Sequence, residues 1–113
     1  MIDLTISIVN YNAAPHLEKC LSTLFTITKD ISYEVIVVDN ASTDGSLEML
    51  KRFSHVTVVA NTENLFFVKA QNQILRMAKG RFCVILNPDV YFEENALKKC
   101  VDFMDQHPEV GAV

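Results

Sequence analysis

The stretch from residue 33 to residue 45, which reads YEVIVVDNASTDG, constrains the fold of this chain more than any other. Its Val35–Val38 run is continuously β-branched, as is typical of a strand that is covered on both faces of a parallel sheet. Polar residues follow at once, beginning with Asp39 and Asn40. Open α/β sheets bind their ligands at the carboxyl ends of the strands. We therefore take Asp39 as the first candidate site residue.

Other apolar segments are predicted to be strands, and segments with helical spacing alternate with them. The strands are predicted at residues 4–9 (LTISIV), 56–60 (VTVVA) and 81–86 (RFCVIL), with GAV at 111–113 as the start of a fifth. Apolar residues recur at helical spacing over residues 17–25, 47–53, 67–78 and 97–104. This alternation predicts an α/β fold with a mostly parallel sheet and helices on both faces, in the order βαβαβαβαβ.

The carboxyl ends of parallel strands share one edge of the sheet, and this edge should hold Tyr11, Asp39 and Asp89. The segment 61–64 (NTEN), which follows the strand predicted at 56–60, should lie nearby. Asp44 is expected to cap the short helix after it, and Gly80 to end a helix in the left-handed conformation. The 113 residues, half of them apolar, are enough for a single domain with its own core.

Composition excludes several classes of function. A net charge of −4 argues against nucleic acid as a partner. With only 3 glycines, the chain contains no dinucleotide fingerprint and no phosphate-cradling P-loop. The 3 cysteines lack CxxC spacing and are expected to be reduced core residues. Because no leader-like segment and no apolar run near the roughly 20 residues of a membrane span is found, we expect a cytoplasmic domain that reaches a membrane face only through regions outside these residues.

The residues of the shared edge suggest chemistry, and each has a structural alternative. Tyr11 could stack on a nucleobase, a contact worth roughly 1 to 3 kcal/mol in single-strand binders, or it could close the sheet edge. Asp39 could accept a hydrogen bond from a base imide or a ribose hydroxyl, or it could bind the amides of its own turn. Lys69, near the start of a predicted helix, could face a phosphate or be solvated surface charge.

Asp89 is the candidate metal ligand. It follows a buried strand and Pro88, which limits the backbone, and a carboxylate held in this way suits a hard divalent cation. Mg²⁺ or Mn²⁺ would bridge Asp89 to a diphosphate and offset its charge. Asn87 could add a carbonyl or a water-mediated contact. The alternative is a Pro-Asp turn that caps the next helix.

Four segments together, SIVNYN, VIVVDNASTDGS, NTENLFFVKAQNQ and LNPDV, resemble the nucleotide-binding half of family 2 inverting glycosyltransferases with the Rossmann-like GT-A fold. The resemblance is closest to the rhamnosyltransferase-like branch and covers nearly the whole chain. It implies a UDP- or dTDP-sugar donor, a Mg²⁺ or Mn²⁺ cofactor, and a glycan or lipid-linked acceptor in polysaccharide biosynthesis.

The resemblance also implies roles for single residues. Tyr11 matches the aromatic beside the donor base, Asp39 the acid that reads uracil or thymine, and Asp89 the last acid of the DxD-type metal motif. Two positions depart from the family: Asn87 replaces the first carboxylate of that motif, and Phe66 stands where the family usually has glycine, near the diphosphate. The other matches are polar positions, namely Asn40, Asp44, Asn64, Lys69 and Asn72.

The predicted nucleotide-binding residues are thus Tyr11, Asp39, Asn40, Asn64, Lys69 and Asn87, with Asp89 as the metal ligand and no catalytic residue. In the resembled family the general base lies in the second half of the domain. We therefore expect residues 1–113 to be the donor-binding part of a longer enzyme, able to bind a nucleotide but not to transfer a sugar.

One alternative is a degenerate nucleotide-binding module. Another is a receiver-like signalling domain, which the acid-free segment 10–12 disfavours. A free edge on the last strand could also promote a homodimer.

Overall fold

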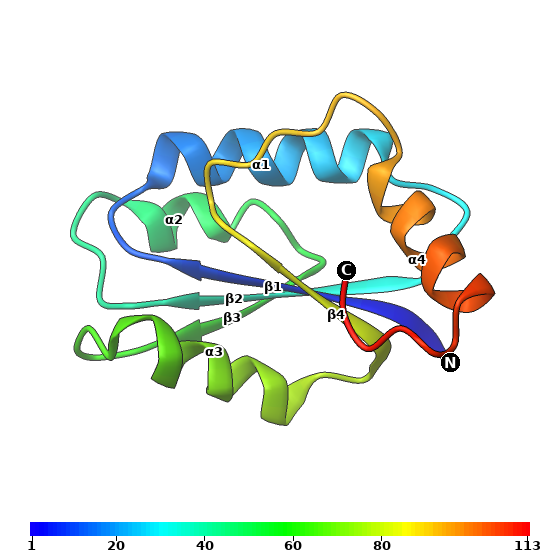
Figure 1. Ribbon diagram of the computed structural model, residues 1–113. Coiled ribbons are helices and arrows are strands. Elements are labelled where there is room, and N and C mark those ends of the chain that lie inside the picture. The colour runs from blue at the N-terminus through cyan, green and yellow to red at the C-terminus, as the bar shows by residue number, and fades with distance from the viewer.

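The computed structural model describes residues 1–113 and confirms the α/β fold class. Eight elements follow one another in the chain: β1 (Ile2–Asn10), α1 (Ala14–Ile27), β2 (Tyr33–Asp39), α2 (Ser46–Leu50), β3 (Val56–Ala60), α3 (Phe66–Met77), β4 (Gly80–Leu86) and α4 (Ala96–Gln106). The strands form one parallel sheet in the order β3-β2-β1-β4. Helices α1, α2 and α4 lie on one side of this sheet, and α3 lies on the other (Figure 1).

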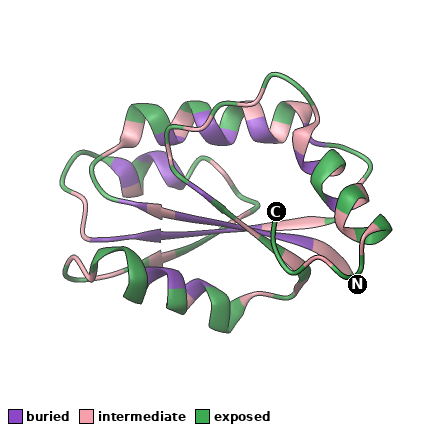
Figure 2. Ribbon diagram, viewed as in Figure 1, coloured by how far each residue is buried: buried purple, intermediate pink, exposed green.

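The core occupies both faces of the sheet. The larger cluster has 14 buried residues and joins the sheet to α1, α2 and α4. The smaller cluster consists of Ile36, Val38, Ala70 and Ile74, between β2 and α3. Successive residues of β2 point to opposite faces of the sheet. Because both faces are covered, Val35–Val38 are all buried, as predicted (Figure 2).

Two predictions about local structure are wrong. Residues 111–113 form no strand, because a strand exists only where its backbone pairs with a neighbour, and these residues make no such bond. They instead line an apolar hollow of about 560 Å³ beside β4 and α4. Gly80 is not a left-handed cap, since α3 is followed by the extended residue Ala78 and Gly80 begins β4.

The cysteines are all free thiols, but only one of them is a core residue. Cys20 is buried on α1, whereas Cys83 and Cys100 are exposed. Cys83 pairs with Thr5 and so lies on the sheet face that carries α3. However, α3 packs mainly on β1 and β2, and its cover does not extend to the edge strand β4. The prediction of reduced core cysteines is therefore correct for Cys20 and wrong for the exposed pair.

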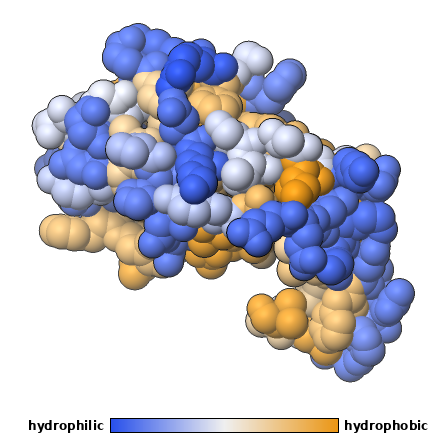
Figure 3. All heavy atoms as spheres, turned by 90° about the horizontal axis from the view of Figure 1, so that it is seen from above, coloured by the Kyte–Doolittle hydropathy of each residue, from blue (hydrophilic) through white to orange (hydrophobic).

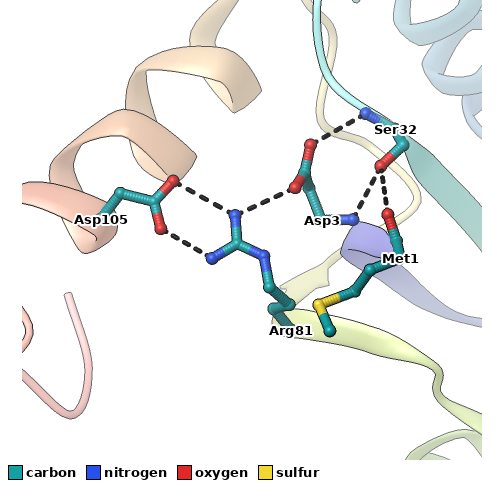
Figure 4. A network of polar contacts seen from close by, with 5 residues as sticks. All are labelled: Met1, Asp3, Ser32, Arg81 and Asp105. Atoms are coloured by element: carbon teal, nitrogen blue, oxygen red, sulfur yellow. Dashed lines mark hydrogen bonds and ion pairs between the residues drawn. The ribbon is translucent and has the colours of Figure 1, made fainter.

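A polar network joins the first and last elements at the amino end of the strands (Figure 4). Arg81 at the start of β4 donates to both carboxylate oxygens of Asp105 on α4, at 2.7 and 3.2 Å, and to Oδ1 of Asp3 on β1, at 2.9 Å. Asp3 in turn accepts the backbone N–H of Ser32. The network thus lies at the end of the sheet opposite the candidate site.

The outer surface on the α1 side is mainly polar. Seen from above in Figure 3, hydrophilic residues cover most of this face, and hydrophobic residues are visible between them in a few patches. None of the helices combines the length and the apolar character that crossing a lipid bilayer requires.

Candidate functional site

The carboxyl ends of the strands meet at one edge, where two loops bind one another. The β1–α1 loop (residues 11–13) and the β2–α2 loop (residues 40–45) follow adjacent strands, because Asn10 pairs with Asp39 in the sheet. The N–H of Asn12 donates to the Ser42 hydroxyl at 2.9 Å, and the N–H of Thr43 donates to the Asn12 side chain at 2.7 Å. The loops are therefore held in one arrangement by the protein itself.

Asp39 lies at the centre of this arrangement and is fully buried. Its Oδ1 accepts hydrogen bonds from the Asn10 amide at 2.9 Å and from the Ser42 hydroxyl at 2.8 Å. Its Oδ2 accepts the Ser42 backbone N–H at 2.9 Å. The carboxylate thus binds its own turn in this structure, which was the structural alternative for Asp39. A nucleobase can reach it only if the Ser42 turn opens.

Asp44 joins the starts of two helices. Its carboxylate accepts the backbone N–H of Ser46, the first residue of α2, at 3.0 Å, and that of Ala14, the first residue of α1, at 2.9 Å. The hydrogen bond from the Ser46 hydroxyl, followed by the backbone bonds, holds the pKa of Asp44 below its usual range. The Asp44 carboxylate therefore binds the start of α2 as predicted, although the N-cap position itself is Gly45, and it also binds the start of α1.

Asn40 positions the segment that follows β3. The side chain is buried; its Nδ2 donates to the Phe66 carbonyl at 3.1 Å, and its Oδ1 accepts from the Asn61 amide at 2.9 Å. Asn61 and Gln73 exchange a further pair of amide hydrogen bonds at 3.0 and 2.9 Å. The Asn40 side chain thus binds the segment after β3 and holds it next to the β2–α2 loop.

Phe66 adopts a backbone conformation that a large side chain rarely takes. Its φ of 62° is left-handed, and its side chain is 75% exposed. Asn64 helps to hold this turn, because its Oδ1 accepts the Phe66 N–H at 2.8 Å. The position where the resembled family has glycine is thus one where glycine would be unstrained. Residues 63–69 line a shallow hollow of about 590 Å³ here, and Lys69 lies exposed at its margin without an ion pair.

Tyr11, Asn87 and Asp89 remain available to a ligand. All three are exposed, and their side chains make no hydrogen bond within the protein. Asp89 lies in a tight turn after β4, in which the Asn87 carbonyl accepts the Val90 N–H at 3.2 Å. The predicted Pro-Asp turn is therefore present, but it does not cap α4, which begins at Ala96. No direct contact joins Asp89 to Asp39.

These residues fit a divalent cation that binds together with a nucleotide. No three His, Cys, Asp or Glu side chains converge on one point, so the protein alone does not form a complete metal cage. Asp89 and Asn87 offer hard oxygen ligands, and Mg²⁺ commonly uses one or two carboxylates together with substrate phosphates and water. The donor set is therefore suited to a cation that arrives with a diphosphate.

Sequence reasoning missed the residues that shape the loops. Asn10 and Ser42 both bind Asp39, and Gln73 binds Asn61, yet none of the three was predicted as a site residue. Asn10 could have been found, because it is a polar residue that ends a buried strand of the same edge. Gln73 could not, since on its helix it resembles any partly exposed polar residue.

The fold and this edge define a protein of the Rossmann-like α/β class. Residues 5–113 match the family described as Glycosyl transferase family 2, and the chain belongs to that family. The resemblance that the four motifs indicated is thereby confirmed.

Relatives with assigned activities support this membership. The chain is 32% identical over 111 residues to a poly(ribitol-phosphate) beta-glucosyltransferase of Bacillus spizizenii, covering 92% of this chain and 17% of that protein. It is 27% identical over 117 residues to an N-acetylglucosaminyl-diphospho-decaprenol L-rhamnosyltransferase of Mycobacterium tuberculosis, covering 93% of this chain and 38% of the relative. The chain thus spans well under half the length of these relatives.

Solved structures show the same fold. Staphylococcus aureus TarS, in a structure with UDP-GlcNAc, superimposes with a TM-score of 0.84 at 25% identity, covering 95% of this chain and 32% of TarS. The mannosyltransferase PcManGT from Pyrobaculum calidifontis, with GDP-Man and Mn²⁺, superimposes with a TM-score of 0.82 at 31% identity, covering 89% and 32%. Both are glycosyltransferases of the GT-A, Rossmann-like fold.

Proposed function

We propose that residues 1–113 form the donor site of a glycosyltransferase that transfers a sugar from a UDP- or dTDP-sugar to an acceptor hydroxyl with inversion. Tyr11 packs beside the base, Asp89 and Asn87 hold Mg²⁺ or Mn²⁺ at the diphosphate, and Lys69 faces a phosphate. Asp39 reads the base once the Ser42 turn opens. The acceptor is a glycan or a lipid-linked sugar.

One observation carries this proposal. Among the predicted site residues, the buried ones bind the loops, whereas Tyr11 and Asp89 stand exposed on the same edge without protein partners. An aromatic ring and a carboxylate that flank a preformed edge match the base and the metal-bound diphosphate of a nucleotide sugar. The UDP-GlcNAc bound to TarS and the Mn²⁺ bound to PcManGT support the ligand classes.

The chemistry is divided between this edge and an acceptor site. A bound divalent cation would offset the charge that the diphosphate gains as it leaves. Asp44 joins the starts of α1 and α2 without using the Ser42 turn, so the two loops stay together when the donor binds. Inversion requires a general base that takes the proton of the acceptor hydroxyl, and we assign that role to no residue between 1 and 113.

Calorimetric titration of UDP, dTDP and GDP, each with and without Mn²⁺, tests the proposal. UDP or dTDP should bind more tightly than GDP, and Mn²⁺ should strengthen that binding. Asp89→Asn should lower the Mn²⁺-dependent affinity by about tenfold or more, since changing even outer-shell groups of metal sites costs tenfold or more. Binding without Mn²⁺ should not weaken, because Asp89 has no protein partner to lose and its carboxylate repels the diphosphate when no cation is bound.

Asp30→Asn is the matched control. Asp30 is also exposed, but it precedes β2 at the other end of the sheet, and its φ of 66° suits asparagine as well as aspartate. Equal loss in both variants would contradict a metal role for Asp89, and a preference for GDP would contradict the base assignment.

A degenerate, non-catalytic nucleotide-binding module is the second candidate. Two features favour it: Asn87 in place of a carboxylate, and the strained, exposed Phe66 in place of glycine. If no nucleotide binds under any of these conditions, the result would favour a degenerate module that has lost its donor or metal affinity.

A further inference from the structure

The segment that follows Asp89 is irregular, yet it is held along α1. Residues 90–95 contain no helix or strand. Figure 1 shows this coil crossing over α1 on its way from β4 to α4. Its apolar residues Val90 and Phe92 pack against the larger core cluster. The path of the chain after Asp89 is therefore fixed in part by packing on the core that α1 shares with the sheet.

Three polar contacts join residues 90–95 to α1 and its end. The Tyr91 hydroxyl shares a hydrogen bond with Nδ1 of His16, and the planes of the two rings are inclined by only 14°. The Phe92 N–H donates to the Thr23 hydroxyl oxygen at 3.0 Å. The Asn95 amide donates to the Lys29 carbonyl at 2.9 Å.

The outer stripe of α1 is arranged for these contacts. His16, Lys19 and Thr23 have the spacing i, i+3 and i+7, which places them on one side of a helix. Lys19 Nζ lies 4.4 Å from the centroid of the Tyr91 ring. The Thr23 hydroxyl donates to carbonyls of its own helix, so its oxygen is free to accept the Phe92 N–H.

Helix α1 also contacts the other half of the candidate site. Its first residue, Ala14, donates to Asp44 of the β2–α2 loop. Asp89 lies close enough to the middle of the helix for its charge to act on Cys20: burial first, and then the negative charge of Asp89, raise the pKa of that thiol to about 11. One helix thus connects the loops around Asp39 with the turn that carries Asp89.

We propose that His16 and Tyr91 are positioning residues that hold the Asp89 carboxylate where a nucleotide-bound Mg²⁺ or Mn²⁺ meets it. The inference rests on the proposed function. The carboxylate itself has no protein partner, so its place depends on how the next two residues are bound. The bond between Tyr91 and His16 is the first side-chain hydrogen bond after Asp89, two residues further along the chain.

Tyr91→Phe tests this, because it removes one hydroxyl and keeps the ring over Lys19. The measurement is the calorimetric affinity of the full chain for UDP with and without Mn²⁺. We expect the variant to lose about three- to tenfold in affinity with Mn²⁺, the range of one hydrogen bond, and to bind UDP without Mn²⁺ as the wild type does. Tyr33→Phe is the matched control, since the Tyr33 hydroxyl makes no hydrogen bond and lies at the amino end of β2.

A double-mutant cycle separates this bond from general damage. His16→Ala and the double variant with Tyr91→Phe should show the same loss as Tyr91→Phe to within about twofold, because all three lack the same bond. A wild type that binds no nucleotide, or binds it equally with and without Mn²⁺, overturns the proposed metal-dependent site and this inference with it. A wild type with Mn²⁺-dependent binding that Tyr91→Phe leaves unchanged, or a variant that loses equally without Mn²⁺, overturns the inference alone.

Discussion

At the scale of single residues, burial decides which polar groups serve the loops and which face a ligand. Asp39 ends β2 and Asn40 follows it, and both are buried: Asp39 binds Asn10 and its own turn, and Asn40 binds the segment after β3. Asp89 follows β4 at the same end of the sheet and is exposed. Buried polar groups must find partners within the protein, whereas an exposed carboxylate is solvated and can exchange water for a ligand.

Phe66 is the residue whose replacement should stabilise the protein. The left-handed backbone conformation costs a residue with a Cβ about 1 to 2 kcal/mol, a strain that glycine avoids. Glycine loses more backbone entropy on folding, however, and this lowers the gain in stability by about 0.5 to 1 kcal/mol. Because Phe66 is mostly exposed, its removal costs little burial. We therefore expect Phe66→Gly to raise the free energy of unfolding by about 0.5 to 1 kcal/mol, measured by urea denaturation.

Phe67→Gly provides the comparison, since it makes the same chemical change one residue further into α3. Glycine in a right-handed helix costs about 1 kcal/mol relative to better helix formers, so this variant should be less stable than the wild type. If both glycine variants shift stability in the same direction, the strain assigned to Phe66 is absent.

At the scale of elements, the close approach of β4 to β1 depends on one position. A Cβ added at Gly80 would lie 2.4 Å from the Thr5 nitrogen and 2.7 Å from the Leu4 carbonyl carbon, both backbone atoms. The Gly80 N–H also donates to the Thr5 hydroxyl at 2.9 Å. The start of β4 can therefore accept a side chain only if the two strands move apart.

Gly80→Ala should destabilise the protein by about 1 to 3 kcal/mol, the usual cost of forcing extra atoms into a packed site. Thermal and urea unfolding measure this cost. Gly111→Ala is the control, because no atom lies within 4 Å of a Cβ built there and its φ is not left-handed. An alanine at position 80 that is tolerated as well as one at position 111 would contradict the close approach.

At the scale of the whole molecule, Arg81 joins the first strand, the last strand and the last helix (Figure 4). The hydrogen bonds from Arg81 are the main reason why the pKa values of Asp3 and Asp105 lie below the usual carboxyl value of 3.8. A carboxyl group whose pKa is lower in the folded chain than in the unfolded chain stabilises the fold at every pH above its unfolded pKa. This contribution is lost as the pH falls below 3.8 toward the folded pKa values.

Arg81→Met should therefore reduce stability at neutral pH and make the protein less sensitive to acid. The difference in unfolding free energy between wild type and variant should shrink between pH 7 and about pH 3, because both aspartates are then protonated in the unfolded chain. Asp44 also has a lowered pKa, but it is present in both proteins and cancels in the comparison. Arg76→Met, which removes an arginine that makes no ion pair, should show no such pH dependence in its difference from wild type. A constant difference for Arg81→Met would contradict the network.

The sequence by itself determined the fold class and the sheet edge on which the candidate site residues lie. The β-branched run Val35–Val38 and the alternation of strand and helix patterns are local features, so they can be recognised in the sequence without knowledge of the tertiary contacts. Parallel strands must then share a carboxyl edge, so Tyr11, Asp39 and Asp89 could be assigned to it before any coordinates. The family followed from the same segments. The alternation did not show that residues 111–113 would lack a strand partner.

Only the tertiary structure decided what each polar group binds. The bond between Asn10 and Asp39 spans 29 positions of the chain, and the bond between His16 and Tyr91 spans 75. No local pattern encodes such pairs, because they depend on how the strands are ordered and how the loops lie on the helices. The same holds for Gly80, which looks like a helix end in the sequence and is instead required by the neighbouring strand. Spacing along the chain predicts periodic structure, whereas the contacts of an irregular loop arise only when distant elements pack together.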